Sequence, residues 1–133
     1  VGLVLDQNTR PHTGGTFVTL FGLPALMSPG PAALALRTGA PLALTVCRPC
    51  GHGRYEMPPS VAIASADLDP RAAGSELELT RRIAAALEDL LRSAPDHWLW
   101  MYKRWKYVPP GHDGAGLPYY AKKLNQKDRV ALD

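Results

Sequence analysis

Short hydrophobic runs separated by glycine and proline mark the first third of the chain. Residues 1–5 are apolar without polar alternation, a pattern typical of a strand buried on both faces. Residues 17–21 are rich in β-forming side chains, and residues 42–47 form a third such run. Between them, residues 32–38 have the composition of a short helix. Because strand, helix and strand in this order imply a right-handed crossover, the pattern predicts parallel pairing.

Residues with capping preferences lie at both ends of the helix expected at residues 32–38. Ser28 is a candidate N-cap, and Pro29 or Pro31 suits the first turn. Gly39 stands where a left-handed C-terminal cap is expected.

A longer helix is predicted from Ser75, because Ser75 and Glu78 have the spacing of a capping box. Apolar residues at helical spacing then give one core-facing stripe: Leu79, Ile83, Ala86, Leu87, Leu90 and Leu91. Weaker strands are expected at residues 54–57 and 61–64, and a loop at 67–74.

Pro95 is expected to open a further helix, stopped by the Pro-Pro-Gly at residues 109–111. One face of that helix would carry Trp98, Met101, Tyr102 and Trp105.

The predicted fold class is therefore α/β, an αβα layered sandwich with a mostly parallel sheet. Because the first residue already lies in a strand-like run, we expect the sheet to be incomplete and the chain to be part of a longer protein. Residues 1–108 would belong to the domain, and residues 109–133, which lack a clear period, would form a loosely attached tail.

Composition narrows the classes of function. The 133 residues are 46% hydrophobic, which is not the composition of a disordered chain. No apolar run approaches the roughly 20 residues that span a bilayer. The net charge is only +3, but basic residues crowd the C-terminal part: Lys103, Arg104, Lys106, Lys122 and Lys123.

Such a basic surface favours anionic partners, unless it is simply a solvated face. Between residues 98 and 106 the basic side chains alternate with aromatic ones, a mixture suited to the membrane interface. Nucleic acid is disfavoured, because no recognised binding motif accompanies the basic residues.

Cys47 and Cys50, with His52 nearby, raise a zinc or redox alternative. A structural zinc site normally needs four ligands, and the chain has no second such pair. A redox pair is expected at a helix start, whereas Pro49 and Gly51 predict a loop here. We therefore expect no metal and no cofactor.

Two blocks of sequence carry a resemblance to a known family. The first contains Asp6-Gln7, Gly14-Gly15, Phe21-Gly22 and the segment 30–41, and the second is residues 98–106. In this order and at this separation they resemble the bacterial lipid A late (lauroyl/myristoyl) acyltransferases of the glycerolipid acyltransferase superfamily. The resemblance implies transfer of a fatty acyl chain from acyl carrier protein or acyl-CoA to a hydroxyl of a phosphorylated lipid A precursor. The reaction would take place at the cytoplasmic face of the bacterial inner membrane, without a cofactor.

The same resemblance suggests substrate-binding residues. It places Asp6 and Gln7 near the site of acyl transfer and Phe21 and Gly22 on the acyl groove. Arg37 would meet a phosphate. The basic and aromatic residues of the second block would lie near the lipid: Lys103, Arg104, Trp105 and Lys106.

Structural explanations stay open for several of these residues. Asp6 could cap a loop. Phe21 could be a core residue before a turn. Arg37 suits the C-terminal end of a helix dipole. We expect Trp98 and Trp105 to be mostly buried.

The superfamily reaction needs a histidine followed five positions later by an acid. None of the four histidines fits: His12, His52, His97 and His112 precede Phe17, Met57, Tyr102 and Leu117 at that spacing. We therefore expect this chain to be the C-terminal portion of an acyltransferase, contributing groove walls but no identifiable catalytic base. Two alternatives stay open: a non-catalytic module that binds anionic lipid, and an acyltransferase for another glycolipid acceptor.

Overall fold

The computed structural model describes residues 1–125 and residue 128. The chain folds as two compact units. The first unit combines Val1–Pro31 with Leu99–Asp133, and the second is Ala32–Trp98. Segments far apart in sequence therefore build the first unit, whereas the second is continuous.

A tight hairpin forms the centre of the first unit. Strand β1 (Thr16–Leu20) pairs antiparallel with β2 (Leu23–Met27). The two turn residues, Phe21 and Gly22, have φ of 53° and 74°, and positive φ at both central positions is the pattern of a type I′ turn. The buried side chains of the hairpin are Val18, Leu20, Ala25, Leu26 and Met27.

The strand predicted at residues 17–21 is thus confirmed, but its partner was not predicted. Pro24 lies within β2 opposite Thr19. Proline lacks a backbone N–H and usually argues against a strand, which is why sequence reasoning ended the β-structure at Gly22. The sequence did contain a signal for this hairpin, because two apolar runs flank the two residues Phe21 and Gly22.

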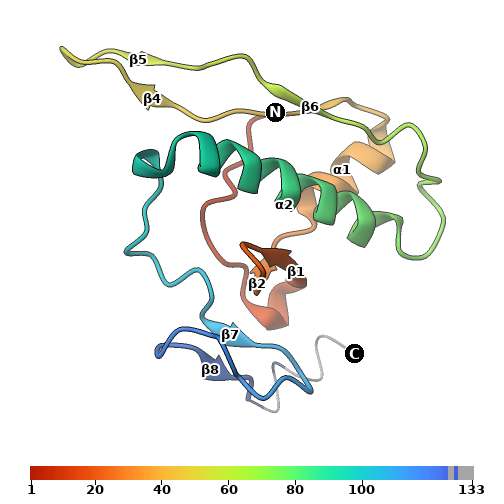
Figure 1. The fold of residues 1–133 in the computed structure, drawn as a ribbon. Coiled ribbons are helices and arrows are strands. Elements are labelled where there is room, and N and C mark those ends of the chain that lie inside the picture. Colours follow the sequence, from red (N-terminus) through yellow and green to blue (C-terminus); the bar gives the residue numbers. More distant parts are fainter. Residues whose placement is uncertain (126–127, 129–133) are drawn as a thin grey trace. The chain divides into compact units, whose positions relative to one another are not determined.

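Residues after 106 contribute a second strand pair to the first unit. Strands β7 (Tyr107–Val108) and β8 (Lys122–Lys123) pair in parallel and lie side by side in Figure 1. Val108 and Leu124 are buried, and the Lys122 N–H donates to the Lys106 carbonyl at 2.8 Å. The stretch predicted to be a tail therefore contains a strand. A short 3-10 helix, η1 (Pro11–Thr13), precedes β1.

Helix α1 (Gly30–Thr38) leads into the second unit and confirms the predicted helix. Ser28 Oγ accepts the Gly30 N–H at 3.2 Å, in keeping with its predicted capping role. Gly39 has φ of 69° and donates its N–H to the Ala35 carbonyl at 2.8 Å, so the predicted C-terminal cap is confirmed.

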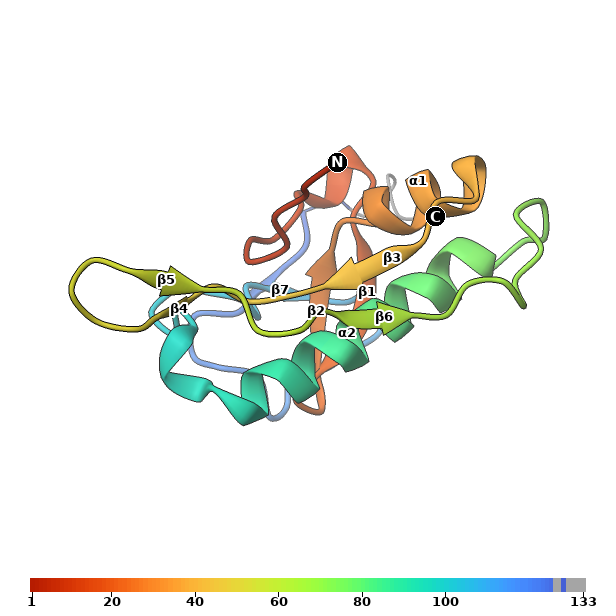
Figure 2. The same cartoon turned by 90° about the horizontal axis from the view of Figure 1, so that it is seen from above.

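One long hairpin and one long helix make up the rest of the second unit. Strands β3 and β6 pair antiparallel, β4 and β5 continue the same hairpin outward, and helix α2 lies along β3 and β6 (Figure 2). The bounds are β3 Leu42–Leu44, β4 Arg48–Pro49, β5 Tyr55–Glu56, β6 Val61–Ile63, α2 Ser75–Ser93 and the 3-10 helix η2 Pro95–His97.

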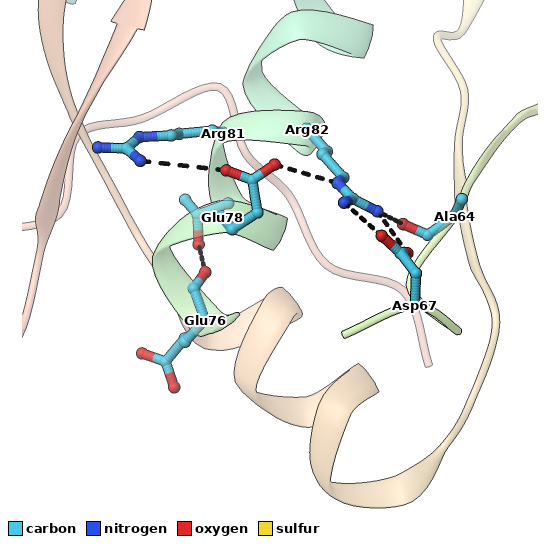
Figure 3. A network of polar contacts seen from close by, with 7 residues as sticks. Ala64, Asp67, Glu76, Glu78, Arg81 and Arg82 are labelled. Atoms are coloured by element: carbon cyan, nitrogen blue, oxygen red, sulfur yellow. Dashed lines mark hydrogen bonds and ion pairs between the residues drawn. The ribbon is translucent and has the colours of Figure 1, made fainter. Parts of the chain in front are cut away.

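The stripe predicted on α2 is buried as expected, except that Ala84 rather than Ala86 is among its buried residues. The predicted capping box is wrong. Gly74, not Ser75, is the N-cap, and no side chain caps the helix. The Glu78 carboxylate instead accepts from Arg82 Nε at 3.2 Å (Figure 3).

Arg82 ties α2 to the loop that follows β6. Its guanidinium forms two hydrogen bonds of 2.7 Å to the Asp67 carboxylate and one of 3.0 Å to the Ala64 carbonyl (Figure 3). The bonds from Arg82 are the main cause that lowers the pKa of Asp67 to about 2. The bonds to Asp67 and Glu78 in turn raise the pKa of Arg82.

The predicted layered sandwich with a parallel sheet is wrong. The described strands form two-stranded pairs, of which β1–β2, β3–β6 and β4–β5 are antiparallel and only β7–β8 is parallel. The error arose because β3 does not continue a crossover from β1. It pairs with β6, its partner across the long hairpin, because antiparallel strands can be joined by a short local connection.

Two local predictions also fail. Residues 1–5 form no strand, and Val1, Leu3 and Val4 are exposed, since no described strand pairs with them. Residues 98–106 form turns rather than a helix, so Trp98, Met101, Tyr102 and Trp105 share no helical face. Among the described residues, no helix has both the length and the hydropathy that crossing a membrane would require.

Candidate functional site

Residues 6–8 and 102–104, from the two signature blocks, bind each other within the first unit. Asn8 is the centre of this contact. Its backbone N–H donates to the Tyr102 hydroxyl at 3.1 Å, and its side-chain Nδ2 donates to the Lys103 carbonyl at 2.8 Å. The partners are 94 and 95 residues apart, so only the tertiary fold could bring them together.

Arg104 completes the contact from a buried position. Its side chain is 1% exposed, and Nη1 donates to the Gln7 carbonyl at 2.6 Å and to Asn8 Oδ1 at 3.4 Å. Nε and Nη2 are buried without a hydrogen-bond partner among the described residues. Sequence reasoning placed this guanidinium near lipid, whereas the structure buries it.

Burial lowers the pKa of Arg104, because the charged form loses its hydration, while the charges of Tyr102 and Asp6 oppose that shift. Arginine nonetheless keeps its charge at neutral pH. Asp6 is therefore attracted by the buried Arg104 cation, which also donates a hydrogen bond to the carbonyl of the following residue, Gln7. Asp6 and Gln7 sit in a bend rather than at the end of a strand. The arrangement fixes the backbone that presents the Asp6 carboxylate.

An aromatic cluster joins the hairpin turn to the second block. The Phe21 ring lies 5.8 Å from the Trp100 ring and 6.4 Å from the Trp105 ring, centroid to centroid. Trp105 Nε1 also donates to the Leu20 carbonyl at 3.2 Å. Aromatic pairs at such separations stabilise by about 0.5–1.5 kcal/mol each beyond their buried area. The cluster accounts for a phenylalanine at a positive φ, a conformation uncommon for residues other than glycine.

The structure thus gathers most of the predicted substrate-binding residues in one unit: Asp6, Gln7, Phe21, Gly22, Lys103, Arg104 and Trp105. Their roles toward substrate stay predictions. Trp105 is half-buried and Lys103 is exposed. Arg37 belongs to the second unit, where it is exposed on the last turn of α1 and has no ion-pair partner among the described residues. Asn8 and Tyr102 were missed, because a polar loop residue and a tyrosine carry no specific local signal.

A histidine–carboxylate contact exists in the first unit, although not at the five-residue spacing of the superfamily motif. His12 Nδ1 lies 2.9 Å from Asp128 Oδ1, 116 residues away in sequence. The His12 side chain is 37% exposed. Because the partners are so distant in sequence, no linear motif could have revealed the pair.

Cys47 and Cys50 are exposed free thiols on either side of β4. Cys50 begins the β4–β5 turn, where its N–H donates to the Arg54 carbonyl at 2.9 Å. Within residues 1–125 and residue 128, no three His, Cys, Asp or Glu side chains gather as metal ligands would. The geometry therefore lends no support to the zinc alternative.

Comparison with known proteins gives a family match that covers both blocks. Residues 1–107 match the family described as bacterial lipid A biosynthesis acyltransferase. Searches of curated proteins and of solved structures gave no match. The match spans both blocks and most of the chain, and it implies an acyl donor and a lipid acceptor in general terms. The chain belongs to the bacterial lipid A biosynthesis acyltransferase family.

Proposed function

We propose that this chain forms substrate-binding walls for transfer of a fatty acyl chain to a hydroxyl of a phosphorylated lipid A precursor. The donor would be acyl carrier protein or acyl-CoA, and the setting the cytoplasmic face of the bacterial inner membrane. Asp6 and Gln7 would lie at the reacting end, Phe21, Gly22 and Trp105 along the acyl chain, and Lys103 toward the acceptor's phosphate. Arg104 would hold the 6–8 segment in place.

The observation that carries the proposal is the hydrogen-bonded contact between residues 6–8 and 102–104. A site for acyl transfer to a charged lipid needs a polar reacting end, an apolar wall and a cationic rim close together. Asn8, Tyr102 and Arg104 join the polar segment to the backbone of Lys103. The next residue along the chain, Trp105, packs against Phe21 in the aromatic cluster. No residue of this chain has the spacing of the family's histidine–acid motif, so the proposal assigns binding and not proton transfer to the described site.

Titration with a diphosphorylated, tetra-acylated lipid A precursor in mixed micelles tests the proposal. Tryptophan fluorescence is a suitable readout, because Trp100 and Trp105 lie beside Phe21. We expect saturable binding that weakens about tenfold in Asn8→Ala, since the variant loses the hydrogen bond to the Lys103 carbonyl and frees the two segments.

Asn125→Ala is the matched control, because this exposed asparagine caps the Asp128 N–H rather than the 6–8 segment. Its affinity should equal that of the parent protein. Absence of saturable binding in the parent would overturn the proposal. Acyl transfer by this chain alone would contradict the assignment of a binding role only, and would direct attention to His12.

A further inference from the structure

A groove of about 420 Å³ opens on the first unit beside the second signature block. This volume lies within the range of ligand pockets, about 300–1,000 Å³. The residues that line it are Met101, Tyr102, Lys103, Lys106, Tyr120 and Lys122. Half of these side chains are lysines, and none of the described residues that line the groove carries a carboxylate.

Two of the lining residues lie outside the part of the chain that matches the family. Tyr120 and Lys122 follow residue 107, the last residue of the match. Parallel pairing of β7 with β8 brings them in, because the Lys122 N–H donates to the Lys106 carbonyl at 2.8 Å. The Lys103 ammonium lies 5.9 Å from the centre of the Tyr120 ring, which positions it over that wall.

The groove is also attached to the candidate site. Tyr102 lines the groove while its hydroxyl accepts the Asn8 N–H at 3.1 Å. One tyrosine thus connects the segment that carries Asp6 with the lysine-lined wall. A ligand in the groove would lie next to the segment proposed to face the reacting groups.

Three lysines that line one groove, with no carboxylate among its described lining residues, suit a phosphate. Lysine is a common phosphate ligand, because its ammonium provides three donors on a flexible stem. Since the lysines are exposed, their mutual repulsion is relieved when an anion enters between them. A cationic ligand would be repelled by these lysines, and a neutral one would gain no charge compensation from them.

The surroundings favour a phosphate carried by a lipid over a free one. Large apolar side chains close in sequence to the lining lysines are exposed: Leu99 (63%), Trp100 (49%), Met101 (90%) and Tyr119 (98%). Tryptophan and tyrosine prefer the interface between headgroups and acyl chains, and lysine prefers anionic headgroups. Side chains with both preferences therefore occur in the two segments that line the groove.

We propose that Lys103, Lys106 and Lys122, with Tyr120, form a binding site for the phosphate of an anionic lipid headgroup, and that β8 completes it. For the identity of that lipid as the acyl acceptor, the inference rests on the proposed function. Lys122 is then a ligand-binding residue that lies beyond the matched family region.

Flotation with vesicles tests this site, using phosphatidylcholine vesicles with and without phosphatidylglycerol. Lys122→Gln should weaken binding to the anionic vesicles about fivefold, and the Lys103→Gln/Lys122→Gln double variant about 25-fold, from the typical contribution of one lysine at an anionic surface. Lys123→Gln is the matched control. Lys123 is the next residue of β8, equally exposed, but it lines the opposite side with His112 and Leu124. Its affinity should stay within about twofold of the parent.

Each other outcome overturns a defined part of the inference. Equal losses in Lys122→Gln and Lys123→Gln would mean diffuse attraction and no site. Displacement from the vesicles by inorganic phosphate at low concentration would identify a free phosphate as the ligand. If the protein bound a short RNA more tightly than the vesicles, the ligand of the groove would be a nucleic acid and not a lipid.

The two proposals fail separately. Saturable binding of the lipid A precursor that is unaffected by Lys122→Gln would overturn the groove and leave the proposed function standing. Vesicle binding that depends on Lys122, without any binding of the lipid A precursor, would overturn the proposed function and leave the groove standing.

Discussion

Replacing Arg104 separates two contributions to the free energy of unfolding: the desolvation of its buried charge and the packing of its side chain. Arg104 is 1% exposed, and two of its three guanidinium nitrogens have no hydrogen-bond partner among the described residues. Methionine keeps much of the length of the side chain and removes the charge, whereas alanine removes both. The comparison of Arg104→Met with Arg104→Ala therefore asks which property stabilises the fold.

The opposing terms at Arg104 are of similar size. Desolvation of a buried ion costs several kcal/mol. The charge-assisted hydrogen bond to the Gln7 carbonyl returns about 1.5–3 kcal/mol, and attraction to Asp6 adds to it. We therefore expect the free energy of unfolding of Arg104→Met to lie within about 1 kcal/mol of the parent. Arg104→Ala should lose a further 2–5 kcal/mol or so, because it leaves a cavity.

Urea unfolding followed by tryptophan fluorescence at neutral pH measures both variants, with unchanged m-values as the check that the compactness of the folded and unfolded states is the same. Precursor binding by Arg104→Met should still weaken, because methionine cannot hold the Gln7 carbonyl. If Arg104→Met were as unstable as Arg104→Ala, the charge would be a net stabiliser and the reasoning would be refuted.

Three further predictions concern single contacts. Trp105→Phe should lower the free energy of unfolding by about 1 kcal/mol, because the Leu20 carbonyl loses its donor. Phe21→Asn should lower it by about 1–2 kcal/mol, since lost aromatic contacts outweigh the relief of a positive φ. Asp67 pairs with Arg82, which lowers its pKa from 3.8 to about 2. That pairing should stabilise the fold fully above about pH 4 and progressively less as the pH falls through 2, so Asp67→Asn should flatten this part of the stability curve.

Matched variants control these measurements. Trp98→Phe should change the free energy of unfolding less than Trp105→Phe, because the Trp98 indole donates no hydrogen bond among the described residues. Phe21→Ala should be less stable than Phe21→Asn, since asparagine tolerates positive φ better. Asp89→Asn, on the exposed face of α2, should lose stability at low pH in the same way as the parent protein. An equal response in any pair would contradict the assigned contact.

Local patterns in the sequence determined helix α1 with its C-terminal cap and the buried face of helix α2. The apolar stripe of α2 appears in the sequence because helical spacing alone decides which face is buried. Gly39 was predictable because a left-handed cap favours glycine whatever surrounds it. The two signature blocks likewise identified the family from the order of short motifs.

Tertiary structure alone decided which strands pair and which charges are buried. Whether a strand pairs parallel or antiparallel depends on its partner. Strand β3 pairs antiparallel with β6, whereas the sequence predicted parallel pairing with β1. Arg104 looked like the other basic residues of its block, yet contacts with Gln7 and Asn8 desolvate it. Lys122 joined the groove through a strand that residues 111–133 did not predict. The physical reason is common to all three: periodicity records which side of a segment is buried, whereas pairing and desolvation depend on groups far away in the chain.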